Sequence, residues 1–277
     1  MTLSFAQINA KQVQVMKLIK KTILITGGTS GIGMELADQL LQRGNTVIVT
    51  GRDIAKLETA QRKLPGLQAF QSDASDPNAI AKLYASVIEH FPDLDVLINN
   101  AGIMRNLNIN GARDLNDVTR EIEVNLSGPV RMVQQFLPHL KAREGALIVN
   151  VSSGLAFIPM AMSPVYCATK AALHSFTQCL RVQLEGTGVT VVELAPPGVE
   201  TPLFRGEFAE EMKGQKGMDV TVLVKAAIAG IEAGKIEIRP GLSNVLKIMS
   251  RVAPQFMFKQ LAKVGKQDPQ PTLRAAR

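Results

Sequence analysis

The segment that most constrains the fold of this chain is a short apolar run followed at once by a glycine-rich turn. Thr22–Thr26 is β-branched and apolar, Gly27–Gly33 has the spacing G-x-x-x-G-x-G, and an apolar-periodic stretch then runs to Gly44. This order predicts a buried strand, a tight turn and a helix closed by glycine. Glycines let a backbone approach a pyrophosphate closely, and a helix N-terminus offers it free N–H groups. Because the spacing differs from the general dinucleotide fingerprint G-x-G-x-x-G, the turn taken alone is also compatible with an ordinary tight loop.

The rest of the chain alternates strand-like and helix-like segments at the spacing of a parallel sheet with crossover helices. Further candidate strands are 46–50, 67–71, 94–98, 146–151, 189–194 and 235–238, and candidate helices lie at about 53–64, 76–90, 114–142, 164–186 and 219–233. We therefore expect one α/β domain with a doubly wound parallel sheet of seven strands and helices on both faces.

Composition agrees with a globular α/β protein and excludes several other classes. The chain has 277 residues, of which 46% are hydrophobic, enough for a full core. It has no apolar run of the ~18 residues that a membrane-spanning helix needs, and its start does not resemble a secretory signal. Cys167 and Cys179 fall in one predicted helix about 18 Å apart, too far for a disulfide, which favours a cytoplasmic location. The three histidines show no metal-ligand spacing, so no metal site is expected.

The net charge of +7 belongs to the two ends of the chain. Residues 1–21 contribute +4 and residues 245–277 contribute +6, which leaves −3 for the middle. A nucleic-acid-binding protein needs a basic face on its folded domain. We therefore expect no nucleic-acid partner.

Tyr166 and Lys170 stand four residues apart in a predicted helix, and Ser153 lies thirteen residues before the tyrosine. Positions i and i+4 share a helix face, so the phenol and the ammonium would lie side by side. An unperturbed tyrosine titrates near ~10, and a neighbouring cation lowers that pKa. A serine hydroxyl nearby would hold a carbonyl or alcohol oxygen while the tyrosine moves a proton. Such pairs are common on helix surfaces, so this interpretation depends on a redox cofactor.

Together these segments resemble the short-chain dehydrogenase/reductase family. The matching pieces, in the family's order over about residues 17–240, are Thr26–Gly33, Asn99–Gly102, Asn125, Ser153, Tyr166, Lys170 and Pro197–Gly198. Within the family, Val151–Phe157 and Pro164–Phe176 are similar to the bacterial branch of oxidoreductases encoded with teichoic-acid D-alanylation genes. The resemblance implies a Rossmann-like fold, hydride transfer with a nicotinamide cofactor, and a homodimer or homotetramer formed through the helices at 114–142 and 164–186.

The resemblance also implies a catalytic set of four residues, Asn125, Ser153, Tyr166 and Lys170. Tyr166 would donate or accept the proton, Ser153 would orient the oxygen, and Lys170 would lower the pKa of Tyr166 and hold the nicotinamide ribose. Asn125 would bend its helix and hold a water that links Lys170 to solvent. Taken alone, Asn125 is equally an incidental polar residue inside a long helix.

Ligands of doubly wound sheets bind at the carboxyl ends of the strands, so the residues after each strand are candidates for cofactor binding. After the first strand these are Gly27, Thr29, Ser30, Gly31, Ile32 and Gly33. Further along, the resemblance implies Asp73 and Ala74 near the adenine, Asn99, Ala101 and Gly102 along the ribose, and Pro197, Gly198, Val199 and Thr201 at the nicotinamide, with Tyr166 and Lys170. Asp73 could instead cap the next helix, and Asn99 could also pin its own turn.

Arg52 follows the second candidate strand. An acid at this place would bind the ribose hydroxyls and favour NAD, whereas a guanidinium pairs with the 2′-phosphate of NADP. Arg52 therefore favours NADP. Asp53, one residue further on, keeps NAD open as the less favoured cofactor, unless its role is to cap the following helix.

Apolar residues surround the predicted catalytic positions in sequence. They are Leu155, Phe157, Pro159, Met160 and Met162 before the tyrosine helix, and Leu203, Phe204 and Phe208 after the predicted cofactor loop. They are candidates for a pocket wall and equally for core. We predict an NADP-dependent oxidoreductase acting on an apolar carbonyl or alcohol. The alternative is a cofactor-binding regulatory or scaffold protein, against which the intact catalytic set argues.

The two ends of the chain are expected to lie outside the catalytic domain, which we place at 16–243. Residues 1–15 are an N-terminal extension and 265–277 a flexible tail. Residues 244–264 predict a basic amphipathic helix with a break at Pro254. We favour packing of its apolar face on this subunit or a partner subunit, with peripheral contact to an anionic membrane surface as the alternative.

Overall fold

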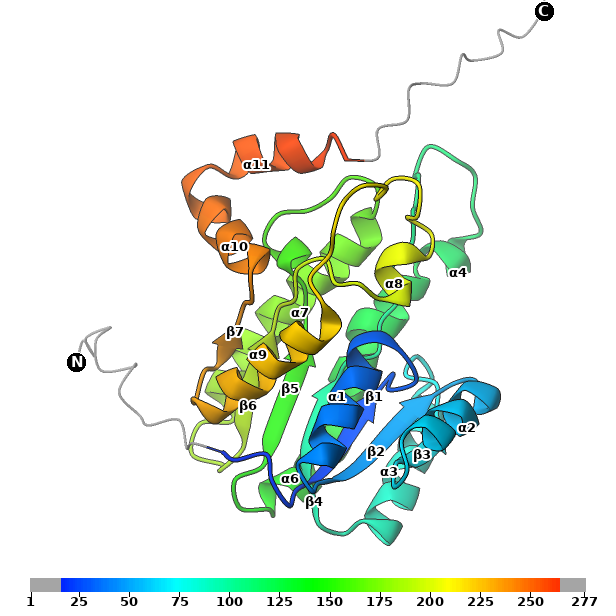
Figure 1. Ribbon diagram of the computed structural model, residues 1–277, viewed down its shortest axis with the longest axis vertical. Helices are drawn as coiled ribbons and strands as arrows, with labels where there is room; N and C mark the ends of the chain where they lie inside the picture. The colour runs from blue at the N-terminus through cyan, green and yellow to red at the C-terminus, as the bar shows by residue number, and fades with distance from the viewer. Residues whose placement is uncertain (1–15, 265–277) are drawn as a thin grey trace, which may run out of the picture.

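A computed structural model describes residues 16–264, and the expected extension at 1–15 and tail at 265–277 lie outside the described residues. Its centre is a parallel sheet of seven strands in the order β3-β2-β1-β4-β5-β6-β7 (Figure 1). The strands are β1 Thr22–Thr26, β2 Thr46–Gly51, β3 Gln68–Gln71, β4 Leu94–Asn99, β5 Leu147–Val151, β6 Thr190–Leu194 and β7 Glu237–Ile238. The expected doubly wound fold is confirmed.

Helices cover both faces of this sheet (Figure 1). The main ones are α1 Gly31–Gln42, α2 Ile54–Lys63, α3 Pro77–His90, α6 Gly128–Lys141, α7 Pro164–Gln183 and α9 Val220–Glu232. Side chains alternate along each strand, so one strand supplies both layers of the core. In β1, Ile23 and Ile25 pack with α1, α2 and α9, whereas Leu24 packs with α3, α6 and α7.

The single helix expected at 114–142 is wrong. The segment is divided into α4 Leu115–Val118, α5 Arg120–Ile122, a π-helical turn η1 at Glu123–Ser127, and α6. A π-helical turn inserts an extra residue into the helical hydrogen-bond pattern, and such turns are frequent at functional sites. Asn125 lies in the middle of this turn, so the helix is irregular at the residue where we expected a bend.

The C-terminal segment forms two helices instead of one, α10 Leu242–Val252 and α11 Pro254–Leu261, with the break before Pro254. Both lie at the same end of the molecule as α8 Pro202–Arg205 (Figure 1). Ser243 and Leu246 are buried against Gly154, where an added Cβ would lie 2.7 Å from Ser243 Oγ. The apolar side chains Val245, Ile248 and Val252 on the opposite side of α10 are exposed, so packing of this apolar face stays a prediction.

None of the helices within residues 16–264 is long and apolar enough to cross a membrane.

Candidate active site

A cavity of about 810 Å³ runs along the carboxyl ends of the strands, from Arg52 and Asp73 at one end to Tyr166 at the other. Most of the predicted site residues line it. These are Gly27, Thr29, Ser30, Gly31, Ile32, Arg52, Asp73, Ala74, Ala101, Gly102, Ser153, Tyr166, Lys170, Pro197, Gly198, Val199 and Thr201. Gly33, Asn99 and Asn125 do not line it. Parallel strands direct residues far apart in sequence to this one edge of the sheet.

The glycine turn after β1 has the geometry of an anion cradle. Gly31 has φ +53°, a conformation in which a side chain is strained. Gly33 is a packing residue, because an added Cβ would lie 2.4 Å from the carbonyl oxygen of Gly27. Ser30 is the N-cap of α1 but makes no side-chain cap hydrogen bond, and the first turn holds no acid. The first N–H groups of α1 therefore remain available to a phosphate, and the turn fits a dinucleotide pyrophosphate.

Ser153, Tyr166 and Lys170 meet at the other end of the cavity. Ser153 comes two residues after β5, and the other two side chains come from the first turns of α7. All three are buried. Lys170 Nζ lies 5.6 Å from the centroid of the Tyr166 ring and donates a hydrogen bond to the carbonyl oxygen of Val151 at 2.9 Å. The phenol and the ammonium meet because they are four residues apart on one helix. The hydroxyl of Ser153 joins them because the end of β5 lies beside α7.

Burial controls the proton affinities of this group. It raises the pKa of the Tyr166 phenol above its usual range, an effect that the hydrogen bond with Ser153 only partly offsets. Burial also lowers the pKa of the Lys170 ammonium to about 8. Loss of water is the largest influence on the Tyr166 phenol. The phenol is therefore protonated near pH 7. That Lys170 lowers the pKa of Tyr166 stays a prediction.

Comparison with known proteins agrees with this arrangement. The model of the short chain dehydrogenase family matches residues 21–212. The chain belongs to this family. It is 41% identical over 247 residues to the protein "Uncharacterized oxidoreductase DltE" of Bacillus subtilis, covering 89% of this chain and 98% of the relative. The expected bacterial branch is thereby confirmed.

Two solved short-chain dehydrogenase structures have the same fold. A short chain dehydrogenase from Burkholderia cenocepacia in complex with NADP is 25% identical, with a TM-score of 0.77 over 89% of this chain and 99% of that one. A 3-ketoacyl-(acyl-carrier-protein) reductase from Brucella melitensis, complexed with NADH, is 27% identical, with a TM-score of 0.72 over 82% of this chain and all of that one. This chain is thus an NAD(P)-dependent short-chain dehydrogenase/reductase.

The end of the cavity that we expect to hold the adenosine has basic side chains beside one acid. Arg52 Nη1 lies 3.9 Å from Asp73 Oδ2, and both side chains line the cavity. Asp53 does not line it, because its carboxylate caps α2 by accepting from the N–H of Lys56 at 3.2 Å. Lys56 itself lines the cavity, which sequence reasoning missed. The sequence feature that could have identified Lys56 is a cation in the first helical turn after Arg52.

The loop after β4 holds two asparagines, of which we expected Asn99 to reach the cofactor and also to pin the turn. Asn99 is buried and donates to Asn150 Oδ1 at 2.9 Å. It is Asn100 that pins the turn, because its side chain donates to the carbonyl oxygens of Thr26 and Gly27, each at 3.0 Å. Asn100 also lines the cavity, and sequence reasoning missed it. Two adjacent asparagines at a strand end point in opposite directions, so the register of β4 decides which one reaches the site.

Asn125 lies behind the catalytic residues and contacts them through other groups. Its Oδ1 accepts from Ile103 N at 2.9 Å, and its Nδ2 donates to Ile103 O at 2.8 Å and to Thr169 Oγ1 at 3.2 Å. A Cβ added to Gly102 would lie 3.3 Å from Asn125 Oδ1 and 3.6 Å from Lys170 Nζ. Gly102 therefore leaves a gap between the amide and the ammonium.

The part of the cavity that we expect to hold the substrate is lined mainly by apolar residues. Of the predicted wall residues, Leu155, Met160, Leu203, Phe204 and Phe208 line the cavity, whereas Phe157, Pro159 and Met162 do not. Sequence reasoning missed Met104, Met212, Met218, Leu242, Leu246, Leu261 and Val264, which also line it. Several of these come from α10 and from the end of α11, so the C-terminal segment completes the wall. Their apolar character was visible in the sequence, but their distance along the chain from Tyr166 hid their place in the site.

Proposed function

We propose that this protein is an NADP-dependent oxidoreductase that transfers a hydride between nicotinamide and the carbonyl or alcohol carbon of an apolar small molecule. The observation that carries this proposal is the position of Tyr166 and Ser153. Their hydroxyl groups lie in one cavity that has the glycine turn and cationic groups at one end and an apolar wall at the other. A carbonyl held against the apolar wall would meet both a proton donor and a nicotinamide.

Two observations support NADP over NAD. Arg52 and Lys56 both line the adenosine end of the cavity and supply two positive charges against the one negative charge of Asp73. Asp53, the acid that would favour NAD, is occupied as the N-cap of α2. Arginine and lysine bind a phosphate monoester more strongly than ribose hydroxyls. The related structures hold NADP in one case and NADH in the other, so the preference rests on residues of this chain.

In the proposed reaction each catalytic side chain has one task. The bound nicotinamide supplies the hydride in reduction and accepts it in oxidation. Ser153 donates a hydrogen bond that orients the carbonyl oxygen, and Tyr166 gives that oxygen its proton. Lys170 places a positive charge beside the phenol. Asn125 bends its helix at η1, and we propose that a water in the gap beside Gly102 links Lys170 to solvent.

We also propose that the chain forms a homodimer or homotetramer through α6 and α7. The outward side of α7 carries the small residues Ala168, Ala171 and Ser175. Val182, on the last turns of the same helix, is 68% exposed. Small side chains let two helices approach closely, and a second copy would cover the exposed valine.

The test is consumption of NADPH and NADH with a panel of apolar ketones and aldehydes, with Tyr166→Phe as the control. We expect NADPH-selective turnover that falls by about 10²- to 10⁴-fold in the variant, since a proton donor is lost. The NADPH dissociation constant, measured by cofactor fluorescence, should not change. Tight NADPH binding without turnover on any carbonyl would contradict the proposal and favour the scaffold function.

A further inference from the structure

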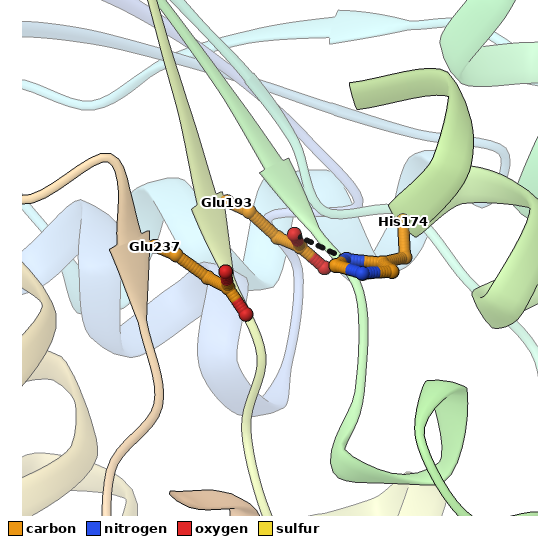
Figure 2. A group of neighbouring side chains, drawn as sticks. All are labelled: His174, Glu193 and Glu237. Carbon is orange, nitrogen blue, oxygen red and sulfur yellow. Dashed lines mark hydrogen bonds and ion pairs between the residues drawn. The ribbon is translucent and has the colours of Figure 1, made fainter. Parts of the chain in front are cut away.

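A fully buried carboxylate lies beside the catalytic serine. Glu193 is on β6, has none of its surface exposed, and accepts a hydrogen bond from Ser152 Oγ at 2.5 Å. Its other oxygen lies 2.7 Å from Nδ1 of His174 (Figure 2). Burial alone would raise the pKa of this carboxyl group, but the hydrogen bonds from His174 and Ser152 and the charge of Arg181 together lower it. Glu193 is therefore an anion with both oxygens engaged.

The two partners of Glu193 belong to the two elements that carry the catalytic groups. Ser152 directly precedes Ser153 after the end of β5. His174 follows Lys170 by four residues and Tyr166 by eight on α7, so the three side chains share one helix face. The carboxylate thus bridges the serine loop to the helix of the tyrosine.

The hydrogen bonds determine which nitrogen of His174 carries the proton. Lys247 Nζ lies 3.0 Å from His174 Nε2, and an ammonium is only a donor, so Nε2 accepts. The proton is then on Nδ1, where it is donated to Glu193. The side chain at position 174 must donate on one side and accept on the other. Lys247 comes from α10 and also lies 4.4 Å from the centroid of the Phe157 ring, so the network continues into the C-terminal segment.

The three side chains in Figure 2 are close enough to hold a metal ion, since their ligand atoms lie within 4.8 Å of one another. The protein already supplies positive charge there. Arg239 lies 3.0 Å and Lys247 3.6 Å from Glu237 Oε1, and Arg181 Nη2 lies 3.9 Å from Glu193 Oε2. These cations already pair with the two carboxylates, so the group is an ion-pair network.

We propose that Glu193 is a positioning residue, which holds Ser153 in register with Tyr166 by bridging Ser152 and His174. This inference rests on the proposed function, because it concerns the same reaction. Misplacing a catalytic group by about 1 Å costs as much as about 10²-fold in rate. Loss of the bridge would also weaken the hydrogen bond from Ser153 that opposes the rise of the Tyr166 pKa.

The first test is Glu193→Gln. Glutamine keeps the shape and still accepts from Ser152, but its amide group would place a donor against the N–H of His174. Asp95→Asn is the matched control, because Asp95 is also a buried carboxylate and binds Thr22 N and Arg143 at the amino end of the sheet. We expect Glu193→Gln to lower kcat by about 10- to 100-fold with unchanged NADPH affinity. Asp95→Asn should lower only the melting temperature.

A second pair separates the bridge from simple packing. His174→Asn places an amide donor near the position of Nδ1 and keeps the hydrogen bond to Glu193, whereas His174→Leu fills the space without a donor. We expect His174→Asn to keep most of the wild-type kcat and His174→Leu to lose as much as Glu193→Gln. Equal kcat in the two His174 variants would contradict the bridge. This comparison remains decisive even if Glu193→Gln fails to fold.

An activity-independent measurement keeps this inference separate from the proposed function. The chain has only two tyrosines, Tyr84 and Tyr166, so fluorotyrosine labelling gives two ¹⁹F signals, assigned with Tyr84→Phe. Glu193→Gln should shift the Tyr166 signal and Asp95→Asn should not. A folded Glu193→Gln variant with the wild-type Tyr166 signal would overturn the proposal. If the wild type turns over no carbonyl, the proposed function fails and the ¹⁹F comparison still decides the bridge.

Discussion

The ammonium of Lys170 donates its hydrogen bond to the carbonyl oxygen of Val151, 2.9 Å away, at the last residue of β5. This contact ties the first turns of α7 to the strand that leads into Ser153. It is made by a cation that is almost completely buried, so the same environment that orders the site also lowers the pKa of Lys170 to about 8. Burial therefore determines both the position of Lys170 and its protonation state.

The rate of carbonyl reduction should depend on the charge of Lys170. The ammonium is present at pH values below its pKa of about 8 and is lost as the pH rises through that value. Tyr166, whose pKa is raised, stays protonated over the same range. We expect kcat/KM for reduction to be constant at acidic to neutral pH and to fall above pH 8, as measured by NADPH consumption with circular dichroism as the control for folding. If kcat/KM declines only at the higher pH where an ordinary lysine loses its proton, then burial does not lower the pKa of Lys170 and this prediction is wrong.

Cofactor selectivity should depend on Arg52. Arg52→Ala removes a cation from the adenosine end of the cavity, so the KM for NADPH should rise by about tenfold or more, which is about 1.4 kcal/mol. The KM for NADH should change by less than about twofold, since NADH has no 2′-phosphate. Lys63→Ala, an exposed cation in the last turn of α2 that does not line the cavity, is the matched control. Equal changes for the two cofactors in Arg52→Ala would refute the assignment of this residue.

Substrate affinity should depend on α11. Leu261 lines the cavity, whereas the exposed Gln260 beside it does not. Leu261→Ser removes apolar contact area worth about 1–1.5 kcal/mol, so the KM for apolar ketones should rise by about five- to tenfold. The matched variant Gln260→Ser should leave that KM unchanged. If both variants behave as wild type toward apolar substrates, α11 is not part of the substrate wall.

The assembly should depend on Val182. A lysine at this exposed position of α7 would place two charges at a helix–helix interface, so Val182→Lys should convert a dimer or tetramer toward monomer in light-scattering measurements. Val222→Lys is the control, because Val222 is a valine with 56% exposure on α9. An unchanged mass for Val182→Lys would exclude the end of α7 from the interface.

Local spacing predicted the parts of this protein that depend on neighbouring residues. The glycine turn, the alternation of strands and helices and the pairing of Tyr166 with Lys170 follow from backbone freedom and helical periodicity, which act over a few residues. The break before Pro254 was predictable for the same reason. The family resemblance added Ser153 and Asn125, and Asn125 does lie in a π-helical turn.

Only the tertiary structure decided which side chains meet across elements. Asn100 rather than Asn99 reaches the cavity, because the end of β4 determines the direction of each side chain. Leu261 lines the site, although it lies far along the chain from Tyr166. Glu193 and His174 touch because β6 packs beside α7. Such contacts depend on how strands and helices pack against one another, and burial then shifts the pKa values of the enclosed groups. The amino-acid sequence by itself therefore determined the fold and the reacting groups, whereas packing decided their neighbours and their pKa values.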